Sequence, residues 1–378
     1  MSFILRPLND LCERNITLIN PKAQPDEEFW YIDISAVDNT TKKITSPWRI
    51  NGKSASVRAR QVVHQSDVIV STTRPNLNAV AIVPSELHDE ICSTGFCVLR
   101  SGPELEPDYL FYFAQSRMFV DSLAALVQGA LYPAVTDKQI FIQPIPWLPL
   151  NEQRQITTKL KNQLAEVETA RKALEWQQQE IVNLANAYIR ESIEQSLVIE
   201  TRLGEVLEEV KKGIGETWAD YPVLGATRGG LAPAKEPPGK QPQRYKPVFC
   251  GTVFYNPMRI LIGSIAFVDD DDEPGITSPD YVVLQGKAGL VDSRWFYYWL
   301  RSPYGEQCIN SLARGAVRER MLFNRLAEGS ILLPPYQKQL RVSKALATLK
   351  PVKYAIQGQL NDLNKIPERL LAQAFENK

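Results

Sequence analysis

Residues 66–83 read SDVIVSTTRPNLNAVAIV, and residues 253–268 read VFYNPMRILIGSIAFV. Each stretch is a pair of β-branched apolar runs joined by a turn, which is typical of two neighbouring buried strands. Displacing the sequence so that Arg74 falls on Arg259 superimposes the two stretches without a gap, and identities continue beyond them. The matched residues include Val68, Ala81, Val83, Ile91, Ser93, Val98, Leu99, Phe111 and Tyr112 on Val253, Ala266, Val268, Ile276, Ser278, Val283, Leu284, Phe296 and Tyr297.

The repeat continues to the end of the chain with one register change. With a displacement larger by one residue, Leu126, Gly129, Pro149, Gln153, Leu160, Leu174 and Leu184 fall on Leu312, Gly315, Pro335, Gln339, Leu346, Leu360 and Leu370. A period of this length indicates a duplicated domain, because solenoid repeats are far shorter. Two copies related by a pseudo-twofold suit a ligand that is itself twofold, and duplex DNA is the leading candidate.

A long helix follows the first copy. From Asn151 onward, nearly fifty residues contain no glycine or proline, and apolar residues recur at spacings of three, four and seven. This pattern predicts an amphipathic helix of roughly 65–70 Å, which needs a partner helix along its length. Residues 337–378 repeat the pattern and provide that partner, with Pro351 and Pro367 expected to kink or restart it. An antiparallel pair of helices would place the two globules at opposite ends of a rod.

The size and composition fit a soluble protein of two or three domains. The chain has 378 residues, of which 44% are hydrophobic and 23% charged. Its five cysteines show no zinc spacing and suggest buried thiols in a reducing compartment. No signal peptide or membrane span is expected, so the location predicted is cytoplasmic. We expect strands and helices in residues 1–148, including one helix over 107–120.

The net charge argues against a protein that binds nucleic acid by bulk charge alone, because 43 basic side chains balance 43 acidic ones. Basic residues nevertheless concentrate in residues 228–247, where Glu236 is the single acid. Acidic residues concentrate in 269–273, which we expect to be a solvated turn.

No catalytic constellation is recognisable. Residues 333–336 (LPPY) resemble the loop of amino-methyltransferases, but Leu333 cannot accept the hydrogen bond that the target amino group would donate. Residues 51–54 (NGKS) end like a phosphate-binding loop without its first glycine. The only histidines are His64 and His88, too few for zinc hydrolysis. The sequence predicts a protein without catalytic residues, metal or cofactor.

Taken in order, these segments resemble the specificity subunits of type I restriction–modification enzymes over essentially the whole chain. The segments that carry the resemblance are 66–83 and 255–268, then 277–284 (TSPDYVVL), 147–153 (WLPLNEQ), 333–339 (LPPYQKQ) and 366–375 (IPERLLAQAF). The second helix start departs from the family at Lys338, where an acidic residue is usual before the glutamine. Pro351 also makes the second helix less regular than the first.

The resemblance implies a mixed α/β fold with two similar target recognition domains in pseudo-twofold arrangement, separated by two long antiparallel helices that form a coiled-coil-like spacer. It places the first domain at 1–148, the central helix at 149–202, the second domain at 203–333 and the C-terminal helix at 334–378. The implied function is sequence-specific recognition of a bipartite site in double-stranded DNA. The subunit would have no activity of its own and would hold two methyltransferase subunits and two restriction/translocase subunits. S-adenosylmethionine, ATP and Mg²⁺ are expected on those partners.

The residues expected to contact DNA are basic or amide side chains on loops, because their donors suit phosphates and base edges. Arg74 and Arg259 are equivalent in the repeat, as are the glycine turns at 128–129 and 314–315. For each arginine a brace within the loop is an equal alternative. The candidates are Arg74, Gln128, Lys138, Arg228, Arg244, Lys246, Arg259, Arg314, Arg318 and Arg320.

Two other functions stay open at this point. The chain could be the recognition subunit of another restriction or phage-defence system that uses a fused methyltransferase–nuclease. It could instead be a two-headed adaptor that binds proteins through its helices and does not bind DNA.

Overall fold

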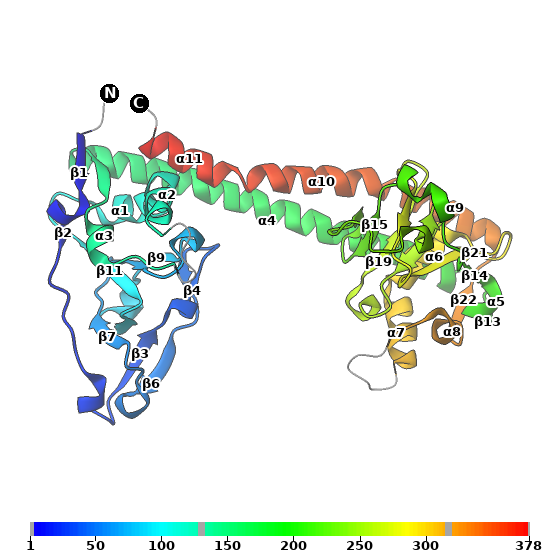
Figure 1. Cartoon of the computed structure of the whole chain (residues 1–378), viewed down its shortest axis with the longest axis horizontal. Coiled ribbons are helices and arrows are strands. Elements are labelled where there is room, and N and C mark those ends of the chain that lie inside the picture. The colour runs from blue at the N-terminus through cyan, green and yellow to red at the C-terminus, as the bar shows by residue number, and fades with distance from the viewer. Residues whose placement is uncertain (1–3, 128–132, 314–319, 377–378) are drawn as a thin grey trace. The chain divides into compact units, whose positions relative to one another are not determined.

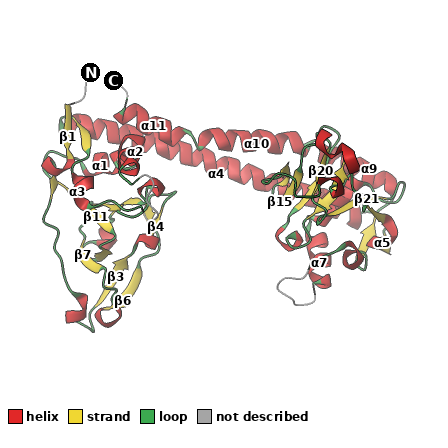
Figure 2. Cartoon of the chain, in the orientation of Figure 1, coloured by secondary structure: helices red, strands yellow, loops and turns green. Residues whose placement is uncertain are grey.

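The computed structural model describes residues 4–127, 133–313 and 320–376 and is mixed α/β throughout (Figures 1 and 2). It contains two compact units: unit 1 is Met1–Ala173 with Leu360–Lys378, and unit 2 is Leu174–Gln359. Helix α4 (Leu150–Glu194) begins in unit 1 and ends in unit 2.

Unit 1 is built on a four-stranded sheet of order β2-β11-β8-β9 and a second one of order β6-β3-β10-β7, in which only β10 and β3 are parallel. A two-stranded ladder β1-β12 and the hairpin β4-β5 complete it. The strands are β1 (Ile4–Pro7), β2 (Cys12–Glu13), β3 (Glu28–Ile32), β4 (Val37–Asp38), β5 (Lys43–Ile44), β6 (Trp48–Asn51), β7 (Ala59–Val62), β8 (Val68–Ser71), β9 (Val80–Ile82), β10 (Ile91–Ser93), β11 (Phe96–Ser101) and β12 (Pro144–Trp147).

Unit 2 has one four-stranded sheet of order β14-β21-β18-β19 and three two-stranded ladders, β13-β22, β17-β20 and β15-β16. Its strands are β13 (Ile199–Arg202), β14 (Leu207–Glu209), β15 (Leu224–Thr227), β16 (Gly230–Pro233), β17 (Lys246–Val248), β18 (Val253–Tyr255), β19 (Ile265–Phe267), β20 (Gly275–Thr277), β21 (Val282–Gly286) and β22 (Ser330–Leu333).

The sequence repeat is a repeat of topology. The sheets β2-β11-β8-β9 and β14-β21-β18-β19 have the same order, and the ladder β1-β12 corresponds to β13-β22. Every residue of β8 and of β18 is buried, as the β-branched and aromatic runs predict for central strands. We call the shared four-stranded sheet and two-stranded ladder of each unit the frame. The units differ outside this frame, because unit 1 adds β3 and β6 to its second sheet whereas unit 2 carries the β15-β16 hairpin.

Among the described residues, three helices follow the frame in each unit. They are α1 (Pro107–Phe113), α2 (Arg117–Ala125) and α3 (Asp137–Phe141) in unit 1, and α6 (Ser293–Leu300), α7 (Pro303–Leu312) and α8 (Phe323–Leu326) in unit 2. The single helix expected over 107–120 was wrong. Its break comes from Ser116, whose hydroxyl accepts the Phe119 N–H and caps a new helix. The short helix α5 (Leu203–Val206) lies between β13 and β14.

The predicted long helix is confirmed by α4, a continuous helix of 45 residues. Its C-terminal half packs into the core of unit 2, where Ala185 and Ile189 join Leu349. Earlier in α4, Gln178 donates a hydrogen bond to Gln357, which comes later than Leu349 in the C-terminal helices, at 3.3 Å. Since earlier residues of α4 meet later residues of its partner, the two run antiparallel.

The C-terminal partner consists of three helices, α9 (Tyr336–Ala347), α10 (Leu349–Leu363) and α11 (Ile366–Phe375). Pro351 and Pro367 both lie in a first helical turn, where a missing N–H leaves no helical bond unmade. In unit 1, Phe375 of α11 packs against Tyr109 and Phe113 of α1, with ring centroids 5.0 and 5.7 Å away.

The acidic segment 269–273 is a docked turn, and the expectation of a solvated one was wrong. Asp269 is buried and bonds to Arg294 on α6, which also pairs with Asp270 at 2.8 Å. Lys350 on α10 pairs with Asp271 and, at 2.8 Å, with Asp272. The concentrated negative charge therefore binds α10 to the globular part of unit 2.

No helix in the described ranges is long and apolar enough to cross a membrane. Among the same residues, no group of three or more His, Cys, Asp or Glu side chains is placed to hold a metal ion.

Candidate nucleic-acid interface

The turn after β8 in unit 1 carries Arg74, whose side chain is exposed and whose backbone adopts the left-handed conformation with φ 50°. Its N–H donates to the Pro133 carbonyl at 2.8 Å, and the Val135 N–H donates to the Thr72 carbonyl at 2.8 Å. The segment that returns after α2 therefore forms part of this turn.

The return segment leads directly to Lys138. Thr136 caps α3 through a reciprocal capping box with Gln139, in which the Thr136 N–H donates to the glutamine side chain at 2.8 Å. Lys138 lies in the first turn of this helix and is exposed. Local capping and the bonds around Arg74 thus bring two of the predicted residues to the same part of unit 1.

Unit 2 repeats this arrangement. Arg259 is exposed and immediately precedes a single 3-10 turn at Ile260–Ile262. The segment that follows α7 returns here too, because the Met321 N–H donates to the Pro257 carbonyl at 3.0 Å. Arg320, next to Met321, pairs with Asp280 at 3.1 Å, and both side chains are exposed. An ion pair at such exposure contributes little stability and leaves the guanidinium free to exchange partners.

The β15-β16 hairpin reaches the same turn. Arg228 occupies the hairpin's tip, is exposed, and its Nε donates to the Ile262 carbonyl at 3.3 Å. A neighbouring pocket of about 330 Å³ is lined by Arg259 together with Lys235 and Tyr245 of the basic segment. The structure therefore brings Arg228, Arg259 and Lys235 to one region of unit 2.

Arg244 and Lys246 have different surroundings. Arg244 is exposed on a 3-10 turn and donates to the Gln241 side chain at 2.9 Å. Lys246 begins β17, is half-buried, and donates to the Tyr281 carbonyl at 2.7 Å. Burial lowers the pKa of Lys246. Its amine thus already has a partner within unit 2. The other three predicted residues, Gln128, Arg314 and Arg318, lie outside the described residues.

Sequence reasoning missed two basic residues that hold this region, Arg301 and Lys353. Arg301 follows α6 and Lys353 lies on α10, and both donate to carbonyls of the hairpin tip. Neither has a signal in the sequence, because contacts to main-chain carbonyls leave no pattern of side-chain types.

The chemistry available in both units is recognition by guanidinium and ammonium donors. Such groups bind phosphates and the acceptor atoms of base edges, guanine above all. In each unit the donors stand on turns held by the frame, which suits contact with a rigid duplex.

Comparison with known proteins points the same way. Residues 5–175 match the family described as type I restriction modification DNA specificity domain. The type I restriction enzyme StySPI specificity subunit of Salmonella potsdam is 21% identical over 361 residues, which cover 85% of this chain and 76% of that protein. The crystal structure of the HsdS subunit from Thermoanaerobacter tengcongensis is 27% identical with a TM-score of 0.56, covering 100% of this chain and 97% of that one.

A chain from a structural study of complex assembly and conformational transition of the type I R-M system is more similar in shape. Its TM-score is 0.75 at 26% identity, with coverage of 100% of this chain and 98% of that one. The two structural matches extend over both units, whereas the family match is confined to residues 5–175. The chain is similar over its whole length to specificity subunits of type I restriction–modification systems. These similarities favour neither a recognition subunit for a fused methyltransferase–nuclease nor an adaptor without DNA binding.

Proposed function

We propose that this chain is a type I specificity subunit that reads a bipartite DNA site, one half with each unit, and holds the methyltransferase and restriction/translocase subunits of the complex. It supplies recognition and assembly and performs no catalysis itself. S-adenosylmethionine, ATP and Mg²⁺ would be used by the partner subunits, on DNA in the cytoplasm.

The observation that carries the proposal is the position of Arg74 and Arg259. Each arginine is exposed at the turn after the corresponding strand of the same four-stranded frame, and each turn is bonded to the segment returning from the helices. Two equivalent basic turns on two copies of one frame fit two contacts with one kind of ligand. Sequence-specific contact with duplex DNA requires such donors on rigid supports.

The parts outside the frame support an asymmetric target. Unit 1 carries β3 and β6 where unit 2 carries the β15-β16 hairpin, so the two units present different surfaces next to equivalent turns. Different surfaces read different bases, and the two half-sites would then differ in sequence.

The helices support the separation of the half-sites. A continuous helix of 45 residues extends about 67 Å at 1.5 Å per residue. Because α4 belongs to unit 1 at one end and to unit 2 at the other, its length would determine how many base pairs stay unread between the half-sites.

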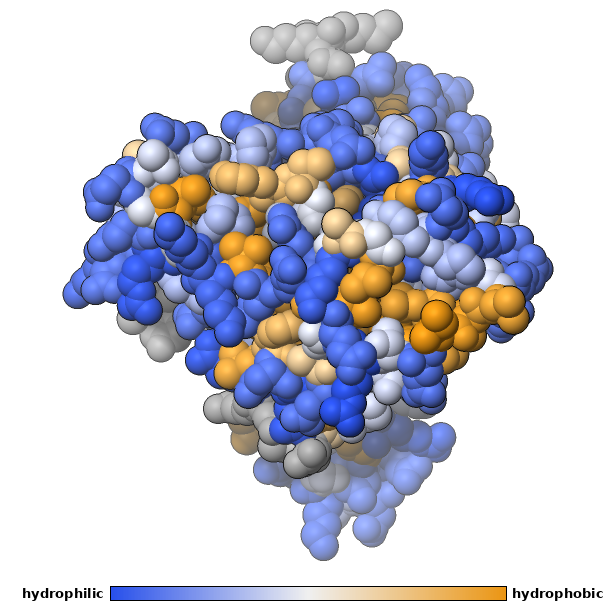
Figure 3. Space-filling model, turned by 90° about the vertical axis from the view of Figure 1, so that its right-hand side faces the viewer, coloured by the Kyte–Doolittle hydropathy of each residue, from blue (hydrophilic) through white to orange (hydrophobic). Residues whose placement is uncertain are grey.

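Exposed apolar surface supports the assembly role. Figure 3 shows hydrophobic residues gathered between hydrophilic ones on one face of unit 2. Leu197 just before β13 is 91% exposed, and Ile199 on β13 is 72% exposed. On the corresponding ladder of unit 1, Ile4 and Leu5 are exposed as well. Equivalent apolar surfaces on two units suit two copies of one partner subunit.

The experiment is methylation mapping of DNA from cells that express the chain with a type I methyltransferase subunit from the same source, followed by binding of the purified complex to the mapped site. We expect one bipartite motif with a fixed spacer, and an affinity that falls as salt rises. Absence of a bipartite motif, or equal binding to the mapped site and to a scrambled duplex, would refute the proposal.

A further inference from the structure

The tip of the β15-β16 hairpin is held by two cationic side chains, one on Arg301, which follows α6, and one on Lys353 of α10. The hairpin pairs Thr227 with Gly230, so Arg228 and Gly229 form a two-residue turn. The guanidinium of Arg301 donates to the Arg228 carbonyl at 2.6 Å, and the ammonium of Lys353 donates to the Gly229 carbonyl at 2.5 Å. Both main-chain carbonyls of the two-residue turn therefore accept a hydrogen bond.

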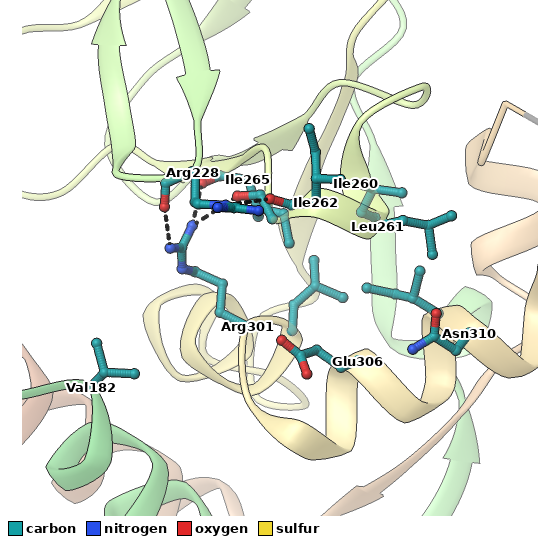
Figure 4. Close-up of a pocket in the computed structure, with 12 residues that line it drawn as sticks. Val182, Arg228, Ile260, Leu261, Ile262, Ile265, Arg301, Glu306 and Asn310 are labelled. Carbon is teal, nitrogen blue, oxygen red and sulfur yellow. Dashed lines mark hydrogen bonds between the residues drawn. The ribbon is translucent and has the colours of Figure 1, made fainter. Parts of the chain in front are cut away.

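Arg301 also joins the hairpin to the frame. Its Nη1 donates to the carbonyls of Gly263 and Ile265, at 3.2 and 3.0 Å, at the start of β19 (Figure 4). In the opposite direction, Arg228 Nε donates to the Ile262 carbonyl at 3.3 Å. The guanidinium of Arg301 lies 5.5 Å from the Tyr297 ring centroid, which adds a cation–π contact. Figure 4 shows the hydrogen bonds of Arg301 and Arg228. Both residues line a pocket of about 440 Å³.

Lys353 joins the hairpin to α10. It lies on α10 three residues after Lys350, on the same face of the helix, and Lys350 binds the acidic turn through Asp271 and Asp272. One face of α10 therefore binds both the acidic turn and the tip of the β15-β16 hairpin.

The charged form of Lys353 is less favourable in this position than it would be at a solvent-exposed one. Burial lowers the pKa of Lys353, and the nearby charge of Arg301 lowers it further. Two like charges are brought together next to one turn, where the carbonyl dipoles compensate them. Such a cost is expected where the position of the turn matters.

The hairpin belongs to the part of unit 2 that departs from the frame shared with unit 1, and Arg228 at its tip lies beside the turn of Arg259. We propose that Arg301 and Lys353 are positioning residues for recognition: they hold the β15-β16 hairpin in the orientation from which unit 2 reads its half-site. This inference rests on the proposed function.

Lys353→Met and Arg301→Gln, each in the full complex, test the proposal. Methylation mapping and binding to duplexes substituted in one half-site at a time are measured. We expect the preference for the correct bases to fall about tenfold, as for loss of a good base contact, in one half-site only. The other half-site and the spacer should not change. Lys353→Arg, which keeps a donor near Gly229, should retain most of the preference.

Lys344→Met is the matched control, because Lys344 is an exposed lysine on α9. Removing its charge should leave both preferences unchanged. Thermal unfolding of each complex shows whether a variant is folded. If Arg301→Gln does not fold, Lys353→Met alone decides. Equal relaxation of both half-sites, or unchanged preferences in a folded Lys353→Met complex, would overturn the inference. A wild-type complex without a bipartite motif would instead refute the proposed function.

Discussion

Gln153 and Gln339 make the same three hydrogen bonds in the two units. Gln153 accepts from the Glu106 N–H at 2.9 Å and donates to the carbonyls of Glu104 and Leu148 at 3.0 and 2.7 Å. Gln339 accepts from the Asp292 N–H at 3.0 Å and donates to the carbonyls of Leu290 and Pro334 at 3.1 and 2.9 Å. Both side chains are 0% exposed. Gln153 therefore joins the start of α4 to the residues that precede α1. Gln339 in the same way joins the start of α9 to the residues that precede α6.

Gln153→Leu and Gln339→Leu should each destabilise the protein, because each leaves buried main-chain groups without a partner. A buried unsatisfied group costs about 1–3 kcal/mol, so each variant should lose at least that much. Denaturant unfolding measures the loss, and Gln177→Leu, at an exposed position of α4, is the control. A loss no larger than that of the control would show that the bonds are replaced by water.

The ion pair of Asp67 and Arg100 in unit 1 is replaced by neutral residues in unit 2. Arg100 binds the buried Asp67 with two hydrogen bonds, at 2.9 and 2.7 Å, whereas Gln285 donates to Thr252 at 3.4 Å at the corresponding place. Asp67→Thr alone should cost about 3–5 kcal/mol, because it leaves the guanidinium without its carboxylate. Adding Arg100→Gln should recover most of that loss. A double-mutant cycle in denaturant checks this, and additive losses would contradict it.

Arg74→Ala and Arg259→Ala should each weaken specific DNA binding in a different half-site. If the arginine contacts a base, discrimination at that position should fall by about 1–3 kcal/mol; if it contacts a phosphate, the salt slope should fall by about one. Binding to duplexes altered in one half-site distinguishes these results. Arg341→Ala, at an exposed position of α9, is the control. Identical effects of both variants on the same half-site would contradict the assignment of one unit to each half.

Lys42 should make stability depend on pH in the alkaline range. Burial lowers the pKa of Lys42 from 10.5 to about 8, and its amine donates to the Asn78 carbonyl. Between these pH values the unfolded chain holds the proton that the folded chain has lost, so stability should rise with pH through this window. Lys42→Met should remove that rise, and Lys43→Met, at the exposed neighbour, should keep it. Parallel pH profiles for Lys42→Met and wild type would contradict the prediction.

Lengthening the helical segment should change the spacer and leave both half-sites unaltered. Seven residues inserted into α4, with seven more inserted into α10 near the contact of Gln178 with Gln357, keep the apolar pattern in register. The addition is about 10.5 Å, roughly the rise of three base pairs. Methylation mapping should then show a spacer longer by about three base pairs. An unchanged spacer would mean that the helices do not set it.

The frame and the long helix were predictable because both depend on patterns that repeat along the chain. The run at Val68–Ser71 and the stripe along α4 show their burial through periodicity. The break at Ser116 was not predicted, because a capping serine between two apolar segments resembles a helix interior in sequence. The acidic turn was misread because Arg294 and Lys350 are distant in sequence from the aspartates that they bind.

The sequence by itself determined that the protein is a duplicated α/β domain with helical spacers, since apolar periodicity and internal repetition are local and additive signals. It also singled out Arg74 and Arg259 as equivalent. Only the tertiary structure decided which basic residues lie together. Lys353 meets Gly229, and Arg320 adjoins the turn of Arg259, through main-chain hydrogen bonds and ion pairs between distant segments. Such contacts depend on how the chain returns on itself, and no spacing of residue types encodes that.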